Sequence, residues 1–294
     1  MWPLFFRTAY VTALITLAGF GPALAEPRTP QSDVDSEHIF GLTSGTDIGD
    51  PGEIEGEIES IGRFGKSAGR YTATSTAAVL KYTAIENFRI APSFSIARHD
   101  IAGVPGFDDR RQWTFDSAGL EFKYRLLDRK RGPFGLVVGV DPHWSPLDSA
   151  TGARADQYSV NMSIALDKEI VSNRLYGALN LLYGPQWTRQ RTANEWERKS
   201  TMGLASALTA QWWPGFLLGA GMRYLRTYDG LGLNAFSGEA LFAGPHFFVK
   251  LSERWNVSGA WNVQVVGHAA GGGGSLDLLN FERHQVQLRF GAQL

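Results

Sequence analysis

The sequence predicts an all-β fold: a single closed antiparallel up-and-down transmembrane β-barrel of about 12 strands. Three observations predict it. Apolar and polar residues alternate with a period of two through most of the chain after residue 52. Short and long links between these alternating stretches follow one another in turn. Most tryptophans stand at the ends of the stretches rather than in their middles.

Residues 1–25 have the features of a cleaved secretory signal peptide. Arg7 supplies a positive charge, residues 8–20 form an apolar core, and Ala23-Leu24-Ala25 precedes Glu26 as a cleavage site. A membrane-anchoring helix is the alternative, but the apolar run is shorter than the roughly 20 residues that span a bilayer. We therefore expect the mature chain to begin at Glu26.

Charge and composition narrow the function. Removing Arg7 from the 28 basic residues leaves 27, against 29 acidic residues. This near-neutral balance argues against a nucleic-acid partner, which calls for a clustered basic excess. The chain has no cysteine, which excludes a disulfide scaffold and thiolate chemistry. We expect no metal and no cofactor.

Residues 26–51 form a polar leader rich in Pro, Gly and Asp. Its only apolar cluster is Ile39, Phe40 and Leu42. We expect this leader to be a periplasmic extension or a segment tucked into the mouth of the barrel, which itself covers residues 52–294.

The first predicted strand, residues 53–61, places four glutamates on one face and Ile54, Gly56 and Ile58 on the other. Each later stretch is about long enough to cross a bilayer at a tilt. These stretches are residues 71–81, 88–98, 113–126, 134–144, 157–167, 175–187, 201–213, 216–228, 235–251, 255–266 and 280–294.

The links between these strands are expected to alternate in length. The short set is residues 82–87, 127–133, 168–174, 214–215 and 252–254. The long set is residues 62–69, 99–112, 141–156, 188–200, 229–234 and 267–279. Tight turns at one end and loops at the other are typical of a membrane barrel, and an even strand count returns both termini to the same side.

Tryptophan placement is the third line of argument. Two girdles of aromatic residues, one at each membrane interface, would place tryptophans at the ends of the strands. Trp113, Trp144, Trp187 and Trp196 stand beside long links, Trp212, Trp213 and Trp255 beside short ones, and Trp261 in mid-strand.

The final stretch carries a resemblance. From His284 onward the even positions are apolar or small (Val286, Leu288, Phe290, Ala292, Leu294) and the odd ones mostly polar. An amphipathic strand at the very end of a chain resembles the closing strand of bacterial outer-membrane β-barrels, although these usually finish on an aromatic residue and this chain finishes on Leu294. The resemblance covers residues 52–294 through alternation and topology.

This resemblance implies a location in the outer membrane of a Gram-negative bacterium. It also implies contact with outer-membrane lipid and lipopolysaccharide, and with the barrel assembly machinery during biogenesis. A soluble sandwich or propeller is the alternative, but no blade-like repeat supports it.

If the polar faces point inward, they line the lumen with charges of both signs. The first and last strands are neighbours in a closed barrel, so their opposite charges would pair across the seam. The expected pore-lining residues are Glu53, Glu55, Glu57, Glu59, Arg89, Glu121, Lys123, Arg125, Arg223, Lys250, Arg283 and Arg289. Such a lining favours a passive channel for small polar solutes. The alternative is a structural or surface-binding barrel whose closed lumen is filled by the same pairs.

A lipid-active hydrolase is the third possibility, resting on His143 and Ser145. Two positions apart on a strand, a histidine and a serine share one face, as in outer-membrane phospholipases and lipid A deacylases. Asp156 or Gln157 would orient the histidine. Strand parity, however, points the pair into the lumen, and the flanking Pro142 and Pro146 suggest that the strand has already ended. Catalysis is therefore the less favoured interpretation.

Overall fold

The computed structural model describes residues 34–191 and 195–294, all within one compact unit that spans residues 32–294. The predicted signal peptide, residues 1–25, and the start of the leader, residues 26–33, lie outside the described residues. Within the described part, no helix has the length and apolarity needed to cross a membrane.

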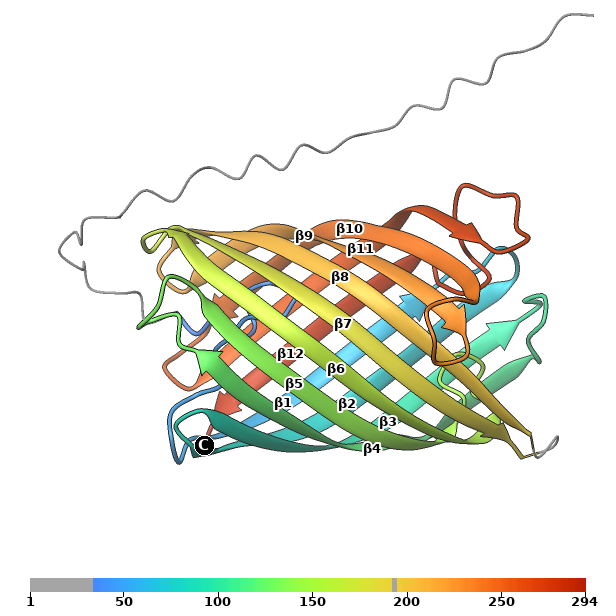
Figure 1. Cartoon of the computed structure of the whole chain (residues 1–294), viewed down its shortest axis with the longest axis horizontal. Helices are drawn as coiled ribbons and strands as arrows, with labels where there is room; N and C mark the ends of the chain where they lie inside the picture. Colours follow the sequence, from blue (N-terminus) through green and yellow to red (C-terminus); the bar gives the residue numbers. More distant parts are fainter. Residues whose placement is uncertain (1–33, 192–194) are drawn as a thin grey trace, which may run out of the picture. The chain divides into compact units, whose positions relative to one another are not determined.

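The described chain forms a closed barrel in which each strand pairs antiparallel with the next and the last strand pairs with the first (Figure 1). This confirms the predicted fold class. The strands are β1 (Ile54–Phe64), β2 (Arg70–Ile85), β3 (Phe88–Ala102), β4 (Arg110–Leu127), β5 (Gly135–Leu147), β6 (Arg154–Val171), β7 (Leu175–Gln190), β8 (Trp196–Trp213), β9 (Phe216–Asp229), β10 (Phe236–Lys250), β11 (Trp255–Ala269) and β12 (His284–Gln293).

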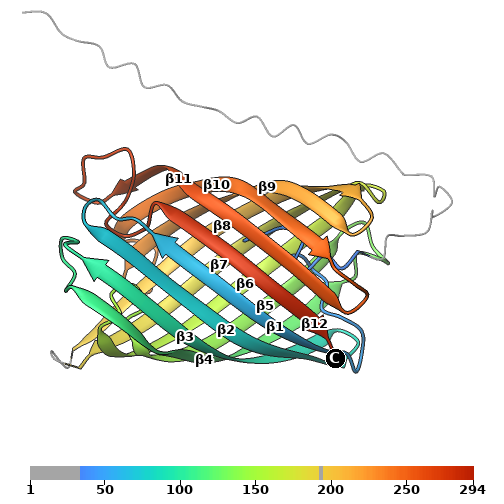
Figure 2. The ribbon, with the colours of Figure 1, turned by 180° about the vertical axis from the view of Figure 1, so that it is seen from behind.

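The seam joins β1 to β12 over most of their length. Figure 2 shows the two strands side by side, with the C-terminus next to the start of β1. In the register Glu59 lies opposite Arg289, and Ile58 lies opposite Phe290. Polar side chains therefore meet polar ones across the seam, and apolar side chains meet apolar ones. A slip of one residue in this register would exchange the two faces.

The outer surface is apolar and the inner surface is polar. Phe94 is 64% exposed and Leu288 is 54% exposed, whereas their neighbours Ser95 and Gln287 are 6% and 4% exposed. This is the reverse of a water-soluble sheet, in which large apolar side chains are the buried ones. The aliphatic and aromatic side chains face hydrocarbon, so the barrel is a transmembrane barrel, and the soluble-sandwich alternative is wrong.

The links define two ends of the barrel. The turn end, where β1 begins and β12 finishes, carries the links 86–87, 128–134, 172–174, 214–215 and 251–254. The loop end carries the links 65–69, 103–109, 148–153, 191–195, 230–235 and 270–283. The prediction that short and long links alternate strictly is wrong, because the turn-end link 128–134 and the loop-end link 103–109 both have seven residues. The strands run past their predicted ends, with β3 reaching Ala102, and so shorten the loops.

The described part of the leader lies inside the turn-end half of the barrel. We call residues 34–49 the plug. Ile39 and Phe40 are 0% and 1% exposed and pack on apolar side chains of β7 to β10. The hydroxyl of Thr209 on β8 donates to the carbonyl oxygen of Ile39 at 2.9 Å, and that of Thr46 donates to Asp167 on β6 at 2.6 Å. Of the two positions expected for the leader, these residues occupy the one inside the barrel.

Candidate functional site: the plugged lumen

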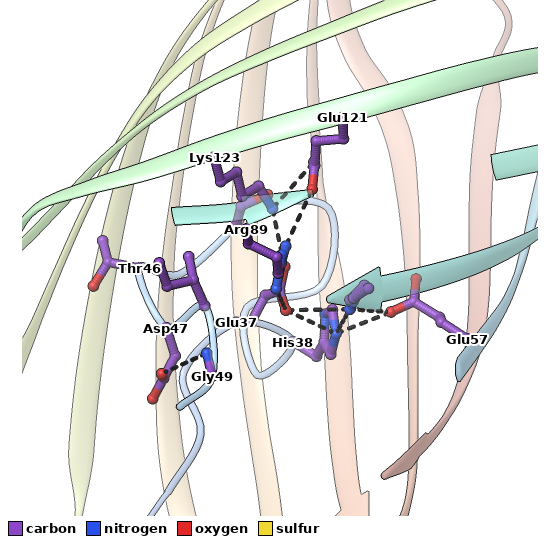
Figure 3. A network of polar contacts seen from close by, with 12 residues as sticks. Glu37, His38, Thr46, Asp47, Gly49, Glu57, Arg89, Glu121 and Lys123 are labelled. Carbon is purple, nitrogen blue, oxygen red and sulfur yellow. Dashed lines mark hydrogen bonds and ion pairs between the residues drawn. The ribbon is translucent and has the colours of Figure 1, made fainter. Parts of the chain in front are cut away.

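The plug is anchored by a buried network of charges centred on Glu37 (Figure 3). Arg89 on β3 donates to both carboxylate oxygens of Glu37, with Nη1 at 2.6 Å from Oε2. Lys123 on β4 reaches Oε1 at 2.9 Å, and Lys81 on β2 reaches Oε2 at 3.1 Å. One carboxylate of the plug thus holds three cations from three neighbouring strands.

His38 extends the network toward the seam. Its Nδ1 lies 2.9 Å from Nη1 of Arg289, and its Nε2 lies 3.0 Å from Glu57 and 2.6 Å from Nζ of Lys81. Arg289 in turn pairs with Glu57 at 2.9 Å and with Glu59 at 2.6 Å. Because successive residues of a strand face opposite sides, these side chains of β1 and β12 point into the barrel. There the plug supplies their remaining hydrogen bonds and ion pairs.

Burial and the neighbouring charges act in opposite directions on Glu37. Burial alone raises the pKa of a carboxyl group, because water stabilises the anion. Arg89, Lys123 and Lys81 outweigh that effect and hold the pKa of Glu37 well below its ordinary value. The plug carboxylate is therefore ionised at neutral pH and stays locked to its partners.

Glu37, His38 and Glu55 bring ligand atoms within 4.8 Å of one another, a spacing that suits a metal ion; no other such group occurs in residues 34–191 and 195–294. The ammonium group of Lys81 already lies 3.4 Å from Glu55, besides its contacts with Glu37 and His38. A metal ion would have to displace this internal cation, so the donor set fits the lysine better than a metal.

A second feature is a cavity of about 300 Å³ toward the loop end. Loop 148–153 folds across it: Tyr71 donates from Oη to the carbonyl oxygen of Ala150 at 2.9 Å, and Gln112 donates to that of Gly152 at 2.7 Å. Its wall is built from polar side chains of β1 to β8. These include Arg63, Ser75, His99, Asp116, Ser117, His143, Ser145, Gln157, Ser159, Asn161, Gln186 and Thr201.

His143 and Ser145 both line this cavity, on the interior face that strand parity predicts. The expectation that the strand ends before them is wrong, because β5 continues to Leu147 with both prolines within it. Because successive residues of β5 face opposite sides, Pro142 and Pro146 lie on the outward face and the histidine and serine on the inward one.

The histidine and the serine are not arranged as a base and a nucleophile. Ser145 donates to the carbonyl oxygen of Leu147 at 2.9 Å, and Asn161 donates to Nε2 of His143 at 2.9 Å. Nδ1 of His143 lies 3.1 Å from Asp141, two residues earlier on the same strand. Neither proposed orienting residue takes that place, since Asp156 binds Arg189 and Gln157 accepts from the backbone of Ser149.

The structure places the other sequence-predicted residues in four regions. Glu55, Glu57, Glu59, Arg89, Glu121, Lys123 and Arg289 meet in or beside the plug network, as the ion pairs above and those of Arg89 and Lys123 with Glu121 show. Arg223 lies farther along the interior and donates to Gln285 at 3.0 Å. Glu53, Arg125 and Lys250 lie near the turn end, where Lys250 binds Glu253, and Arg283 is an exposed residue of loop 270–283.

Sequence reasoning missed Glu37, His38 and Lys81 in the network, and Asp141 and Asn161 around His143. The spacing Asp141-x-His143 was a usable signal, because residues two apart share a strand face. Glu37 and His38 carried no such signal, since the leader has no strand period.

A closed barrel with an apolar outer face and a charged, plugged interior has the fold of outer-membrane β-barrels. Two solved structures share it. The COG4313 outer membrane channel from Pseudomonas putida F1 is 14% identical, with a TM-score of 0.56 over 89% of this chain and 100% of that one. The β-domain of the Bordetella autotransporter BrkA is 10% identical, with a TM-score of 0.52 over 83% and 100%.

The chain belongs to the family described as "Family of unknown function (DUF6662)", whose model matches residues 32–294. The match includes the plug as well as the barrel. In a comparison with curated protein sequences, none matches this chain.

Proposed function

We propose that this protein is an outer-membrane channel for small polar solutes, with a resting state in which the plug closes the turn end. The observation that carries the proposal is the polar cavity of about 300 Å³, which continues the charged wall toward the loop end. A similar fold in a protein described as an outer membrane channel supports it. With an exported chain, the turn end faces the periplasm and the loops face outward.

Passage requires the plug to leave the turn end. The plug is joined to β1 through Gly49 and Gly52, whose φ angles are +81° and +86°. Glycine adopts this left-handed region without the steric cost that other residues meet. We therefore place the hinge of the plug at these two glycines, next to Glu53.

A closed structural or surface-binding barrel is the second candidate. The observation in its favour is the completeness of the plug: Ile39 and Phe40 are fully buried and Glu37 is paired with three cations. In that case the plug would be a permanent core and the loops would carry the function. A hydrolase is disfavoured by the separate hydrogen bonds of His143 and Ser145.

Planar-bilayer recording tests the proposal with two forms of the chain, the natural one and a deletion of residues 34–49. We expect rare, small current steps from the natural chain and larger, long-lived steps from the deletion. Folding of both is checked by circular dichroism and by resistance to unfolding in detergent.

If the folded deletion passes no current, the channel proposal is wrong and the closed barrel is favoured. Glu37→Gln supplies a second test, should the deletion fail to fold, because it loosens the plug and keeps every other side chain. Fatty-acid release that His143→Ala abolishes would favour the hydrolase instead.

A further inference from the structure

The loop-end cavity contains one arginine and one aspartate that are not paired with opposite charges. The side chain of Arg63 on β1 makes no hydrogen bond or ion pair with any residue of the described chain. Asp116 on β4 is 9% exposed and accepts from the hydroxyls of Ser75 at 2.6 Å and Ser95 at 3.0 Å. No cationic side chain of the described part pairs with Asp116.

The turn-end network provides the contrast. There, glutamates of the wall and the plug lie within 3.4 Å of a lysine or arginine. Charges in a low-dielectric interior are stable when paired and costly when alone. Two unpaired opposite charges in one cavity therefore form a dipolar site whose complement is absent from the chain itself.

The wall explains why these two residues do not simply pair with each other. They stand on β1 and β4, three strand spacings apart, or roughly 14 Å along the wall. The register runs from Arg63 to Ala73, then to His99 and to Gln112 on β4, so Asp116 also lies four residues along β4 from the position level with Arg63. The small side chain of Ala73 lines the cavity beside Arg63 and brings no charge that could pair with the arginine.

The other lining groups are hydrogen-bond donors and acceptors, and His143 among them is already paired with Asp141 at 3.1 Å. His99 is 1% exposed, its Nε2 is 3.2 Å from the carbonyl oxygen of Ser149, and its Nδ1 has no partner within the described chain. Ser159 and Gln186 add a hydroxyl and an amide from β6 and β7. These groups hydrogen-bond a polar solute without adding a net charge.

We propose that this cavity binds a small zwitterionic solute of the amino-acid class, with its carboxylate on Arg63 and its ammonium group on Asp116. An arginine guanidinium matches a carboxylate with two parallel hydrogen bonds. A simple anion or cation satisfies one charge and leaves the other unpaired, and a neutral polyol satisfies neither. The inference rests on the proposed function, because it names the solute class that the channel selects.

The test uses four probes of similar size: L-serine as zwitterion, lactate as anion, ethanolamine as cation and glycerol as neutral solute. Calorimetry measures their binding to the full chain in detergent, and swelling of proteoliposomes measures their passage. We expect serine to bind at least about tenfold more tightly than the other three, because each charge-assisted contact contributes that much.

Arg63→Gln and Asp116→Asn separate the two ends of the solute. Both variants should lose about tenfold in serine affinity; Arg63→Gln should shift the preference toward ethanolamine, and Asp116→Asn toward lactate. The matched control is Arg131→Gln, since Arg131 is 73% exposed within the turn-end link 128–134 and its loss should leave serine binding unchanged.

The outcomes distinguish this inference from the channel itself. Equal binding of all four probes, or serine binding that survives both variants, overturns the zwitterion site. Passage of all four solutes without preference also overturns it and leaves the channel standing. Tight serine binding with no passage in any form, the plug deletion included, supports the site and overturns the channel.

Discussion

Replacing Glu37 by Gln should release the plug without disturbing the barrel. The substitution preserves size and removes the one charge that Arg89, Lys123 and Lys81 share. Breaking a buried ion pair costs about 3–5 kcal/mol when the partner charge is left alone. Here Arg89 and Lys123 keep Glu121, so we take the lower limit of about 3 kcal/mol. At 1.36 kcal/mol per tenfold, the released population rises on the order of 100-fold.

Hydrogen exchange measures this release at the backbone amides of the plug. We expect exchange in residues 34–49 to accelerate on the order of 100-fold, while the amides of the strands keep their protection. Glu86→Gln is the matched control, because Glu86 and Arg131 form an exposed pair, 54% and 73% exposed, at 2.6 Å. Exposed pairs contribute about 0–1 kcal/mol, so the control should change exchange fivefold at most. Unchanged exchange in a folded Glu37→Gln chain would show that the network does not hold the plug.

Three further perturbations probe the same architecture. The pKa of Glu37 is depressed on folding, so its contribution to plug stability is complete above about pH 4.5 and is lost only in stronger acid. The protection factors of the plug amides, which correct for the intrinsic pH dependence of exchange, should therefore fall well below pH 4.5 in the natural chain by more than in Glu37→Gln, and an equal fall in both chains would contradict this. Phe40→Ala should destabilise the docked plug by about 3–5 kcal/mol, seen as faster plug exchange with an unchanged barrel melt. Burial lowers the pKa of Lys66 to about 8, so between about pH 8 and 10.5 the folded chain binds fewer protons than the unfolded chain. The free energy of unfolding therefore rises with pH in this range. Urea titrations of Lys66→Met should show no such rise.

The barrel could be predicted from the sequence because its rules are local. A strand alternates its faces at every residue, so Glu57 and Ile58 are assigned to opposite sides without knowledge of their partners. Closure follows from an even set of such strands and an amphipathic last one. The strand ends could not be predicted, because polar side chains at the membrane rims keep the same period: β3 continues through Arg98 and Asp100 to Ala102.

Only part of the charged network could be predicted, because only part of it lies on strands with a local period. The wall side of the network, including Arg89 and Arg289, follows from strand parity. The plug side does not, because His38 meets Arg289 across 251 positions of sequence and no local period marks it. Counting the charges of the wall does not predict the contacts of the plug either. Cations and anions of the wall also pair with each other, as Lys123 does with Glu121 at 3.2 Å.

The two halves of the turn-end wall show why the barrel holds this segment. Side chains fill an eight-stranded barrel, but 12 strands enclose a wider space. On β7 to β10 the inner face there is largely apolar, with Tyr176, Leu217 and Phe248 each 7% exposed or less, whereas on β12 and β1 to β4 it is charged. The plug matches both halves with four consecutive residues, Glu37 and His38 toward the charges and Ile39 and Phe40 toward the apolar wall. Water in a permanently open bore would wet that apolar face at a cost, so the wall is built for a docked plug, and the channel we propose opens from a closed resting state.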